Sequence, residues 1–450
     1  MKIWKGNNEE HKESMLKFKG KKILLLGSSL GTLDIIKYAK KNGAVTILAD
    51  NLPVDKSIGK QFADENVLIS TADIEALKKY VKDNEVDGIF AGISEFNLLK
   101  AMELCQFFRF PFYCTKEQWD IIADKERFRN LCVMYDVPSP KTYYSGDDVP
   151  REIFDIIQFP VIVKPVDSTA SVGISICENL EDLNKAIPFA IKNSGKKRII
   201  VEEFFEGEEF TAHYSIVNGE VSLSCIDNRV PIAVNGGFVT TVPLARIYPS
   251  TFIVNYIEQV NDKMMALCKS LKLNTGVLFV QGLYNRQSNK FSIFEAGLRC
   301  AGEVPYHIIE KVNGLNFMNN FVDYALSGKV LKYDISKEDP FFKGKSCCVT
   351  SFVSKGGTVG RIIGYNEIQN KVKSIINSEC RYKEGDVTPS GNTLHQIMLR
   401  FVLVCDNIEQ MIRDVEIINN SVKVLDEKGD DLCYRFDVKT YMDNVKVNLS

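Results

Sequence analysis

The sequence predicts an α/β protein in which helices cover a sheet of parallel strands. Lys22–Gly27 is a short apolar run that ends in glycine, and a helix-like segment, Leu33–Lys41, follows it. A second strand is expected over Ala44–Asp50, a helix over Asp73–Asp83 and a third strand over Gly88–Gly92. Strands that alternate with helices are typical of a parallel sheet with covering helices.

A chain of 450 residues is too long for one compact core, so several packed units are expected. We expect an N-terminal Rossmann-like α/β domain over 1–115, a middle domain over 116–330 with a mobile subdomain at about 138–205, and a small α+β domain over 331–450. Beyond residue 115 the expected strands are 159–165, 174–177, 198–201, 360–364, 398–405 and 422–426. Hairpins are expected over 210–227, with the turn at Asn218-Gly219, and over 277–295. Helices are expected over 256–271 and 408–418.

Composition excludes several classes of protein. The formal net charge is -2, with 45% hydrophobic and 25% charged residues, so neither a disordered chain nor a partner bound through nucleic-acid phosphates is expected. The 12 cysteines include no CxxC pair and there are only 4 histidines, which favours reduced, buried thiols over a zinc site. The first twenty residues are polar, and no apolar run reaches the roughly 20 residues of a spanning helix. A soluble cytoplasmic protein without membrane contact is therefore expected.

A dinucleotide site in the N-terminal domain is weakly supported. The Gly-x-Gly-x-x-Gly pattern would need a glycine where this chain has Ser29, and without it the backbone cannot approach a pyrophosphate closely. Asp50, at the end of the second strand, keeps the alternative of a nicotinamide-dependent oxidoreductase open. A structural domain that supports a site elsewhere is the preferred interpretation.

Two lysines and a polar loop indicate a phosphate site. Lys125 opens a helix that Asp124 is placed to cap, where exposed N–H groups favour anions. Lys164 lies in an apolar strand, and either lysine alone would read as a surface residue. The loop after Lys164 is rich in hydroxyl groups and contains Ser168, Ser171 and Gly173. On a flexible hairpin, such a loop forms a lid over a nucleotide.

An acidic segment follows at 201–210. Glu202, Glu203, Phe205 and Glu209 form either an acidic surface linker or a hinge that meets adenine and ribose. Further along, Gln281 and Glu295 lie on neighbouring strands, and their oxygen atoms suit Mg²⁺, which shares its ligands with phosphates. Arg299 either presents a planar fork to a phosphate or forms a buried ion pair with Glu295.

In this order the motifs resemble those of the ATP-grasp superfamily, closest to its carbamoyl-phosphate-synthetase-like and biotin-carboxylase-like carboxylate–amine ligases. The resemblance covers nearly the whole chain and implies an ATP-grasp fold with a Rossmann-like N-terminal domain. It matches Lys125 and Lys164 to phosphate-binding lysines, and Arg299 to the arginine that steadies the transferring phosphoryl group. The remaining matches are the lid loop (Ser168, Ser171, Gly173), the adenine hinge (Glu202, Glu203, Phe205), the ribose carboxylate (Glu209) and the metal ligands (Gln281, Glu295).

One position departs from the family pattern. The usual Glu-x-Asn-x-Arg signature reads Glu295-Ala-Gly297-Leu-Arg299 here, so a metal-binding asparagine is replaced by glycine. This puts a second Mg²⁺ ion in question.

The resemblance implies an ADP-forming ligase that uses ATP and Mg²⁺, with Mn²⁺ as an alternative. A small carboxylic acid such as an amino acid would become an acyl phosphate, and an amine would then displace phosphate. Arg229, Arg246 and His307 are candidate substrate contacts, while His213 is expected to have a structural role. A catalytically impaired ATP-binding regulator is the alternative, motivated by Gly297, and the resemblance allows a homodimer.

Overall fold

The computed structural model describes residues 16–28, 31–167, 172–232, 242–391 and 393–449. Its N-terminal sheet has the strand order β3-β2-β1-β4 and is entirely parallel. The strands are β1 (Lys22–Leu26), β2 (Val45–Asp50), β3 (Glu65–Leu68) and β4 (Gly88–Ala91), with helices α2 (Thr32–Lys41), α3 (Ile58–Phe62), α4 (Ile74–Asp83) and α5 (Glu95–Phe108). The predicted strand–helix alternation is confirmed.

Asp50 has a structural role in this domain. Its carboxylate lies 2.6 Å from Ser57 Oγ and 2.9 Å from the buried Lys60 Nζ. These contacts occupy the oxygen atoms that a ribose would need, which favours the structural interpretation of the N-terminal domain. Ser29, the other residue on which a dinucleotide site depends, lies outside the described residues.

A small antiparallel sheet forms the predicted lid subdomain. Its strand order is β5-β8-β6-β7, and helix α8 packs on β6 and β7. The elements are β5 (Thr142–Gly146), β6 (Val161–Pro165), β7 (Ser175–Cys177), α8 (Leu180–Lys192) and β8 (Ile199–Glu203). Its separate apolar core, around Val161, Val163 and Leu183, allows the subdomain to move as a unit.

The central sheet has four antiparallel strands in the order β10-β9-β13-β14. Both predicted hairpins are present, and Asn218 and Gly219 adopt positive φ angles of 54° and 80° at the first turn, as a type I′ turn requires. The strands are β9 (Glu208–Val217), β10 (Glu220–Ile226), β13 (Thr275–Asn285) and β14 (Lys290–Gly297), accompanied by α6 (Lys116–Ala123), α7 (Lys125–Met134), α9 (Ile253–Tyr256) and α10 (Asp262–Ser270).

The C-terminal sheet draws strands from two regions of the sequence. Its order is β11-β12-β15-β19-β17, with β21 also paired to β15. Two strands that the sequence analysis missed, β11 (Asn228–Pro231) and β12 (Pro243–Tyr248), join it to β15 (Ser346–Ser354), β17 (Ile375–Cys380), β19 (Ile397–Cys405) and β21 (Cys433–Tyr434). The rest of this region comprises β16 (Gly357–Ile363), β18 (Val387–Thr388), β20 (Lys423–Asp426), α13 (Ile368–Lys371), α14 (Ile408–Ser421) and α15 (Val438–Leu449).

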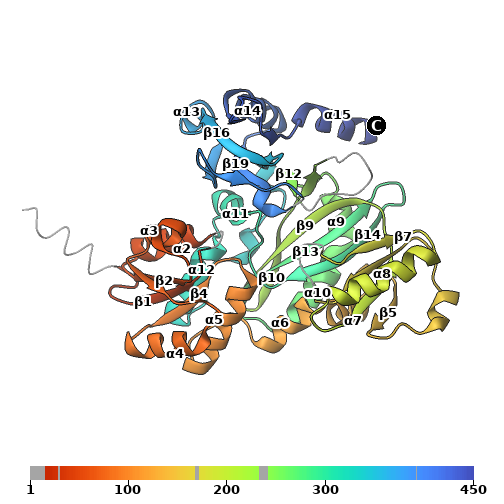
Figure 1. Cartoon of the computed structure of the whole chain (residues 1–450), viewed down its shortest axis with the longest axis horizontal. Coiled ribbons are helices and arrows are strands. Elements are labelled where there is room, and N and C mark those ends of the chain that lie inside the picture. The colour runs from red at the N-terminus through yellow and green to blue at the C-terminus, as the bar shows by residue number, and fades with distance from the viewer. Residues whose placement is uncertain (1–15, 29–30, 168–171, 233–241, 392, 450) are drawn as a thin grey trace, which may run out of the picture.

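Figure 1 shows the N-terminal sheet and the lid subdomain at opposite ends of the molecule, with the central sheet between them and the C-terminal region above. Helices α11 (Tyr306–Asn313) and α12 (Phe317–Ser327) follow the central sheet, and α12 packs against α2 and β4 of the N-terminal domain. In the described part of the chain, no helix combines the length and apolarity needed to cross a bilayer.

Glu338 is a buried carboxyl group in the segment between α12 and β15. Its Oε2 lies 2.6 Å from Ser224 Oγ on the central sheet, and its Oε1 has no hydrogen-bond partner among the described residues. Burial raises the pKa of Glu338 to about 7, so the folded protein holds this proton across a range in which an exposed glutamate has lost it. Its contribution to stability is therefore full below pH about 4.5 and is lost as the pH rises through about 7.

Glu338→Gln should therefore raise the free energy of unfolding at pH 8, by up to about 3 kcal/mol, and leave it nearly unchanged at pH 5. Urea unfolding at both pH values measures this, with the exposed Glu427→Gln as control. A gain of equal size at the two pH values would show that Glu338 is already ionised in the folded state.

Candidate active site

Two rows of side chains cross one face of the central sheet. Thr211, Gln281 and Glu295 lie directly opposite one another on β9, β13 and β14. Two residues along, His213, Phe279 and Gly297 form the second row. Because opposed residues in an antiparallel pair point to the same face, the sheet itself gathers these groups.

Gln281 and Glu295 fit one Mg²⁺ ion. They are directly paired and both are partly exposed, and side chains opposed in this way have Cβ atoms about 5 Å apart. The described residues include no group of three or more His, Cys, Asp or Glu side chains placed to hold a metal. The two oxygen ligands would therefore leave most of the shell to water and phosphate, which is how Mg²⁺ is held at nucleotide sites.

Lys164 belongs to a buried charge cluster that joins the lid to the central sheet. The Glu202 carboxylate lies 2.7 Å from Lys164 Nζ and 2.6 Å from Arg129 Nε. Arg129 also donates to the carbonyl oxygen of Ile293 at 2.7 Å, and to that of Phe294 at 3.3 Å. Burial by itself would raise the pKa of Glu202, but the two cations outweigh it and lower this pKa to about 2.

The three residues that the sequence analysis matched to an adenine hinge therefore differ in burial and contacts. The Glu202 side chain is enclosed by its two cations, while Glu203 is exposed and Phe205 is half-buried. Phe294 occupies a bulge of β14 and lies with its ring centroid 5.9 Å from Lys164 Nζ. A bulge re-aims a side chain in this way, so Phe294 is an additional candidate for the nucleotide site.

The N-terminus of α7, where the sequence predicts phosphate binding, has the predicted cap. Asp124 accepts hydrogen bonds from the backbone N–H groups of Glu126 and Arg127 at 3.1 and 3.2 Å. Lys125 occupies the first position of the helix and is half-buried. Burial is the main cause of the lowered pKa of Lys164, and the charge of Lys125 adds to it, which places the two lysines in one electrostatic environment.

Part of the lid loop lies in the described chain. Gly173 has a φ of 78°, and a Cβ there would lie 2.7 Å from both Pro165 Cγ and Asn193 Cβ. Glycine is therefore needed at this position for the loop to pack against β6 and α8. Ser168 and Ser171 lie outside the described residues.

Glu209 and Arg299 both have ion partners that the sequence analysis did not identify. Glu209 is paired with Arg229 of β11. Arg299 donates to Glu95 Oε1 from Nε at 3.2 Å and from Nη2 at 3.1 Å. Its guanidinium carbon also lies 4.8 Å from the centre of the Phe279 ring. The alternative of a Glu295–Arg299 ion pair is wrong, because the partner comes from the N-terminal domain.

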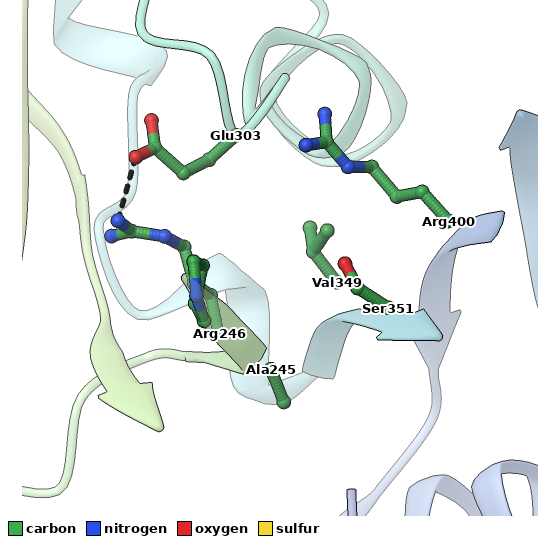
Figure 2. A pocket seen from close by; sticks show the side chains of 7 residues that line it. Ala245, Arg246, Glu303, Val349, Ser351 and Arg400 are labelled. Carbon is green, nitrogen blue, oxygen red and sulfur yellow. Dashed lines mark hydrogen bonds and ion pairs between the residues drawn. The ribbon is translucent and has the colours of Figure 1, made fainter. Parts of the chain in front are cut away.

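A small cavity adjoins the two rows, at the junction of the middle domain with the C-terminal sheet. Arg246 donates to Thr211 Oγ1 at 2.7 Å, to Asp227 at 2.6 Å and to Glu303 at 2.6 Å. Arg400 of β19 reaches the cavity from another strand and donates to the Gly302 carbonyl at 2.7 Å (Figure 2). The cavity, about 10 Å³ in volume, is lined by Pro243, Ala245, Arg246, Glu303, Val349, Ser351 and Arg400.

The cavity's charges are unevenly compensated. Burial would raise the pKa of Glu303, but Arg246 and the other cationic and hydrogen-bonding groups around it together lower this pKa to about 2, so Glu303 is ionised at neutral pH. Among the described residues, the ion-pair partner of Arg400 is Glu379, at 4.0 Å. Burial lowers the pKa of Arg400 to about 10, although the charges of Glu379 and Glu303 favour its protonated form. Arg400 therefore carries the charge with the weakest compensation, and its Nε has no hydrogen-bond partner in the described chain.

The two histidines considered in the sequence have different surroundings. His213 is a buried strand residue, as expected; burial lowers its pKa to about 4, and its Nε2 finds no partner among the described residues. His307 does not line the cavity. Its Nε2 lies 3.1 Å from Asp34 of α2 and 3.0 Å from Asn377 Nδ2, at the junction of the N- and C-terminal regions.

Comparisons with known proteins identify related sequences and folds. The family model described as D-ala D-ala ligase C-terminus matches residues 133–240. The carbamoyl phosphate synthase large chain of Clostridium botulinum is 23% identical over 434 residues, which is 87% of this chain and 39% of that protein. This chain thus spans about two fifths of that relative's length.

Two solved structures cover almost the whole described fold. The L-amino acid ligase from Bacillus licheniformis matches with a TM-score of 0.72 and 14% identity, over 91% of this chain and 99% of that one. Phosphoribosylglycinamide synthetase from Anaerococcus prevotii has a TM-score of 0.70 and 18% identity, over 91% and 100%. The chain has the ATP-grasp fold.

Several charged residues of this candidate site were not singled out from the sequence. They are Glu95, Arg129, Asp227, Glu303 and Arg400. Arg400 had a usable signal, since an arginine inside the apolar run 397–405 must find a partner or a ligand when buried. Glu95 had none, because its partner is 204 residues away in sequence.

Proposed function

We propose that the chain is an ADP-forming carboxylate–amine ligase that works through an acyl phosphate. The observation that carries this proposal is the adjacency of two sites on one sheet. Gln281 and Glu295 would hold the metal–phosphate end of ATP, and their neighbour Thr211 accepts a hydrogen bond from Arg246 of the cavity. Neighbouring strands are about 4.8 Å apart, so a carboxylate in the cavity lies within reach of a γ-phosphoryl group.

Different charged residues would serve the nucleotide and the acid substrate. Phosphoryl transfer needs positioning and neutralisation of charge more than a general base, and Lys125, Lys164 and Arg299 supply positive charge around the nucleotide. A bound Mg²⁺ would neutralise phosphate oxygens between Gln281 and Glu295. Arg400, with its weakly compensated charge, would hold the acid's carboxylate.

The balanced reaction has two steps. One carboxylate oxygen attacks the γ-phosphorus, and the bond to the β-phosphate oxygen breaks to release ADP. The amine then attacks the acyl carbon, phosphate leaves, and the amine loses a proton. Glu303 is ionised and has an unpaired Oε2 among the described residues, so it is placed to accept a hydrogen bond from the amine.

The cavity must open to admit a substrate. A volume of about 10 Å³ is near the minimum for one water molecule. Because the lining residues come from both the middle and C-terminal regions, we expect entry to require a shift between these regions. Enclosure of this kind would shield an acyl phosphate from water once the substrates are bound.

The test is release of ADP from ATP and Mg²⁺ in the presence of panels of amino acids and other small carboxylic acids, each paired with amines. We expect release that requires one acid–amine combination.

Arg400→Met should raise the KM for the acid about 10- to 100-fold, because the variant loses one charge-assisted hydrogen bond to the carboxylate. The exposed Arg413→Met should leave this KM unchanged. ATP binding without ADP formation in every mixture would favour the regulatory alternative that Gly297 suggests.

A further inference from the structure

Gly297 is explained by the residue opposite it. Phe279 on β13 is its direct cross-strand partner, and a Cβ at Gly297 would lie 2.4 Å from Cε1 and 2.6 Å from Cζ of the Phe279 ring. Gly297 has no positive φ, so glycine is required here for space and not for backbone conformation. The aromatic ring lies across the glycine and fills the room that a side chain would take.

This filled space is where the family pattern places a metal ligand. Gly297 lies two residues from Glu295 on the same face of β14, so an asparagine there would direct its oxygen toward the cation held by Glu295. The Phe279 ring offers no oxygen atom. Mg²⁺ requires six oxygen ligands in near-octahedral geometry, and the ring both removes one ligand and excludes the water that could replace it.

A fixed positive charge borders the same space. The Arg299 guanidinium lies 4.8 Å from the Phe279 ring centre, a cation–π distance. Two hydrogen bonds to Glu95 of α5 hold it there. A second divalent cation would therefore meet an aromatic ring and a guanidinium group in place of a carboxamide.

We infer that this site binds a single divalent cation, on Gln281 and Glu295, and that the Phe279–Gly297 pair excludes the second. The inference rests on the proposed nucleotide site. Arg299, held by Glu95 and Phe279, takes over the neutralisation of phosphate charge that a second cation provides in two-metal sites.

The test counts cations per bound nucleotide. The whole chain is titrated with Mn²⁺ in the presence of a non-hydrolysable ATP analogue. Electron paramagnetic resonance distinguishes bound from free Mn²⁺. Calorimetry gives the number of nucleotide molecules bound per chain. We expect one Mn²⁺ per nucleotide and no spin coupling between manganese ions. Two Mn²⁺ ions per nucleotide in the unmodified chain would overturn the inference while leaving the nucleotide site standing.

A double variant tests the cause. Gly297→Asn alone would clash with the ring, so it is combined with Phe279→Leu, which opens the space; Phe401→Leu, in the C-terminal sheet, is the matched control. We expect the double variant to bind two Mn²⁺ per nucleotide and the control to bind one. If the double variant still binds one, the ring is not what excludes the second cation. If no analogue binds to the unmodified chain, the proposed function fails and the inference falls with it.

Discussion

Replacing Lys164 with alanine should lower ADP formation by about 100- to 1,000-fold while the protein remains folded. The variant loses the buried positive charge that lies beside Phe294 and Glu202, at the proposed nucleotide site. The buried Glu202 carboxylate keeps Arg129 Nε at 2.6 Å, so it is not left without a counterion. The expected loss of folding free energy is therefore no more than about 1–3 kcal/mol.

Lys185→Ala is the matched control, because this lysine is exposed on α8 of the same subdomain and pairs only with the neighbouring Glu181. ADP release under the conditions that support the unmodified chain gives the activity, and calorimetry gives the affinity for MgATP. Circular dichroism confirms that both variants fold. Full activity in Lys164→Ala would remove this lysine from the site and with it the predicted phosphate contact.

The elements that could be predicted from sequence are those with local signals. The turn at Asn218-Gly219, the glycine-ended strand before Gly27 and the Asp124 cap each depend on a few neighbouring residues, and each is confirmed. Gln281 and Glu295 were paired correctly because a hairpin fixes its own register once its strands are recognised.

What could not be predicted are the partners supplied by distant parts of the chain. Arg299 was expected to meet a phosphate or Glu295, yet Glu95 lies 204 residues before it. Arg400 reaches Gly302 across 98 residues. β11 and β12 are short and pair with each other, and β12 joins the C-terminal sheet through β15, about a hundred residues later in the sequence. The cavity beside Arg246 and Arg400 is lined by residues that such long-range contacts bring together.

Gly297 shows how a residue can be recognised in sequence and still be interpreted incompletely. The missing asparagine was apparent from the signature alone. Its compensation was not, because Phe279 reads as an ordinary apolar strand residue until the register places it opposite the glycine. The pair is a coupled feature, so a change at either position alone would leave a clash or a gap.

Replacing Arg246 with methionine should reduce folding stability by about 3–5 kcal/mol. The Lys164 variant differs, because its main expected loss is of activity and not of stability. In the lid cluster one carboxylate has two cations, whereas here one cation serves two carboxylates, Asp227 and Glu303. Asp227 is fully buried. Without Arg246, the only hydrogen-bond donor left to its carboxylate among the described residues is the backbone N–H of Thr211. An unpaired buried charge is far more costly than a lost surface contact.

The control is Arg361→Met, an exposed arginine on β16, which should change the free energy of urea unfolding by less than about 0.5 kcal/mol. Adding Asp227→Asn to Arg246→Met removes the stranded charge, so the double variant should recover a substantial part of the loss, although it regains no substrate contact. Such recovery identifies electrostatics as the cause, because two contacting residues share an interaction free energy that independent sites lack. If the two losses simply add, Arg246 stabilises the fold through packing, and the cavity's charge arrangement would have to be explained by substrate binding alone.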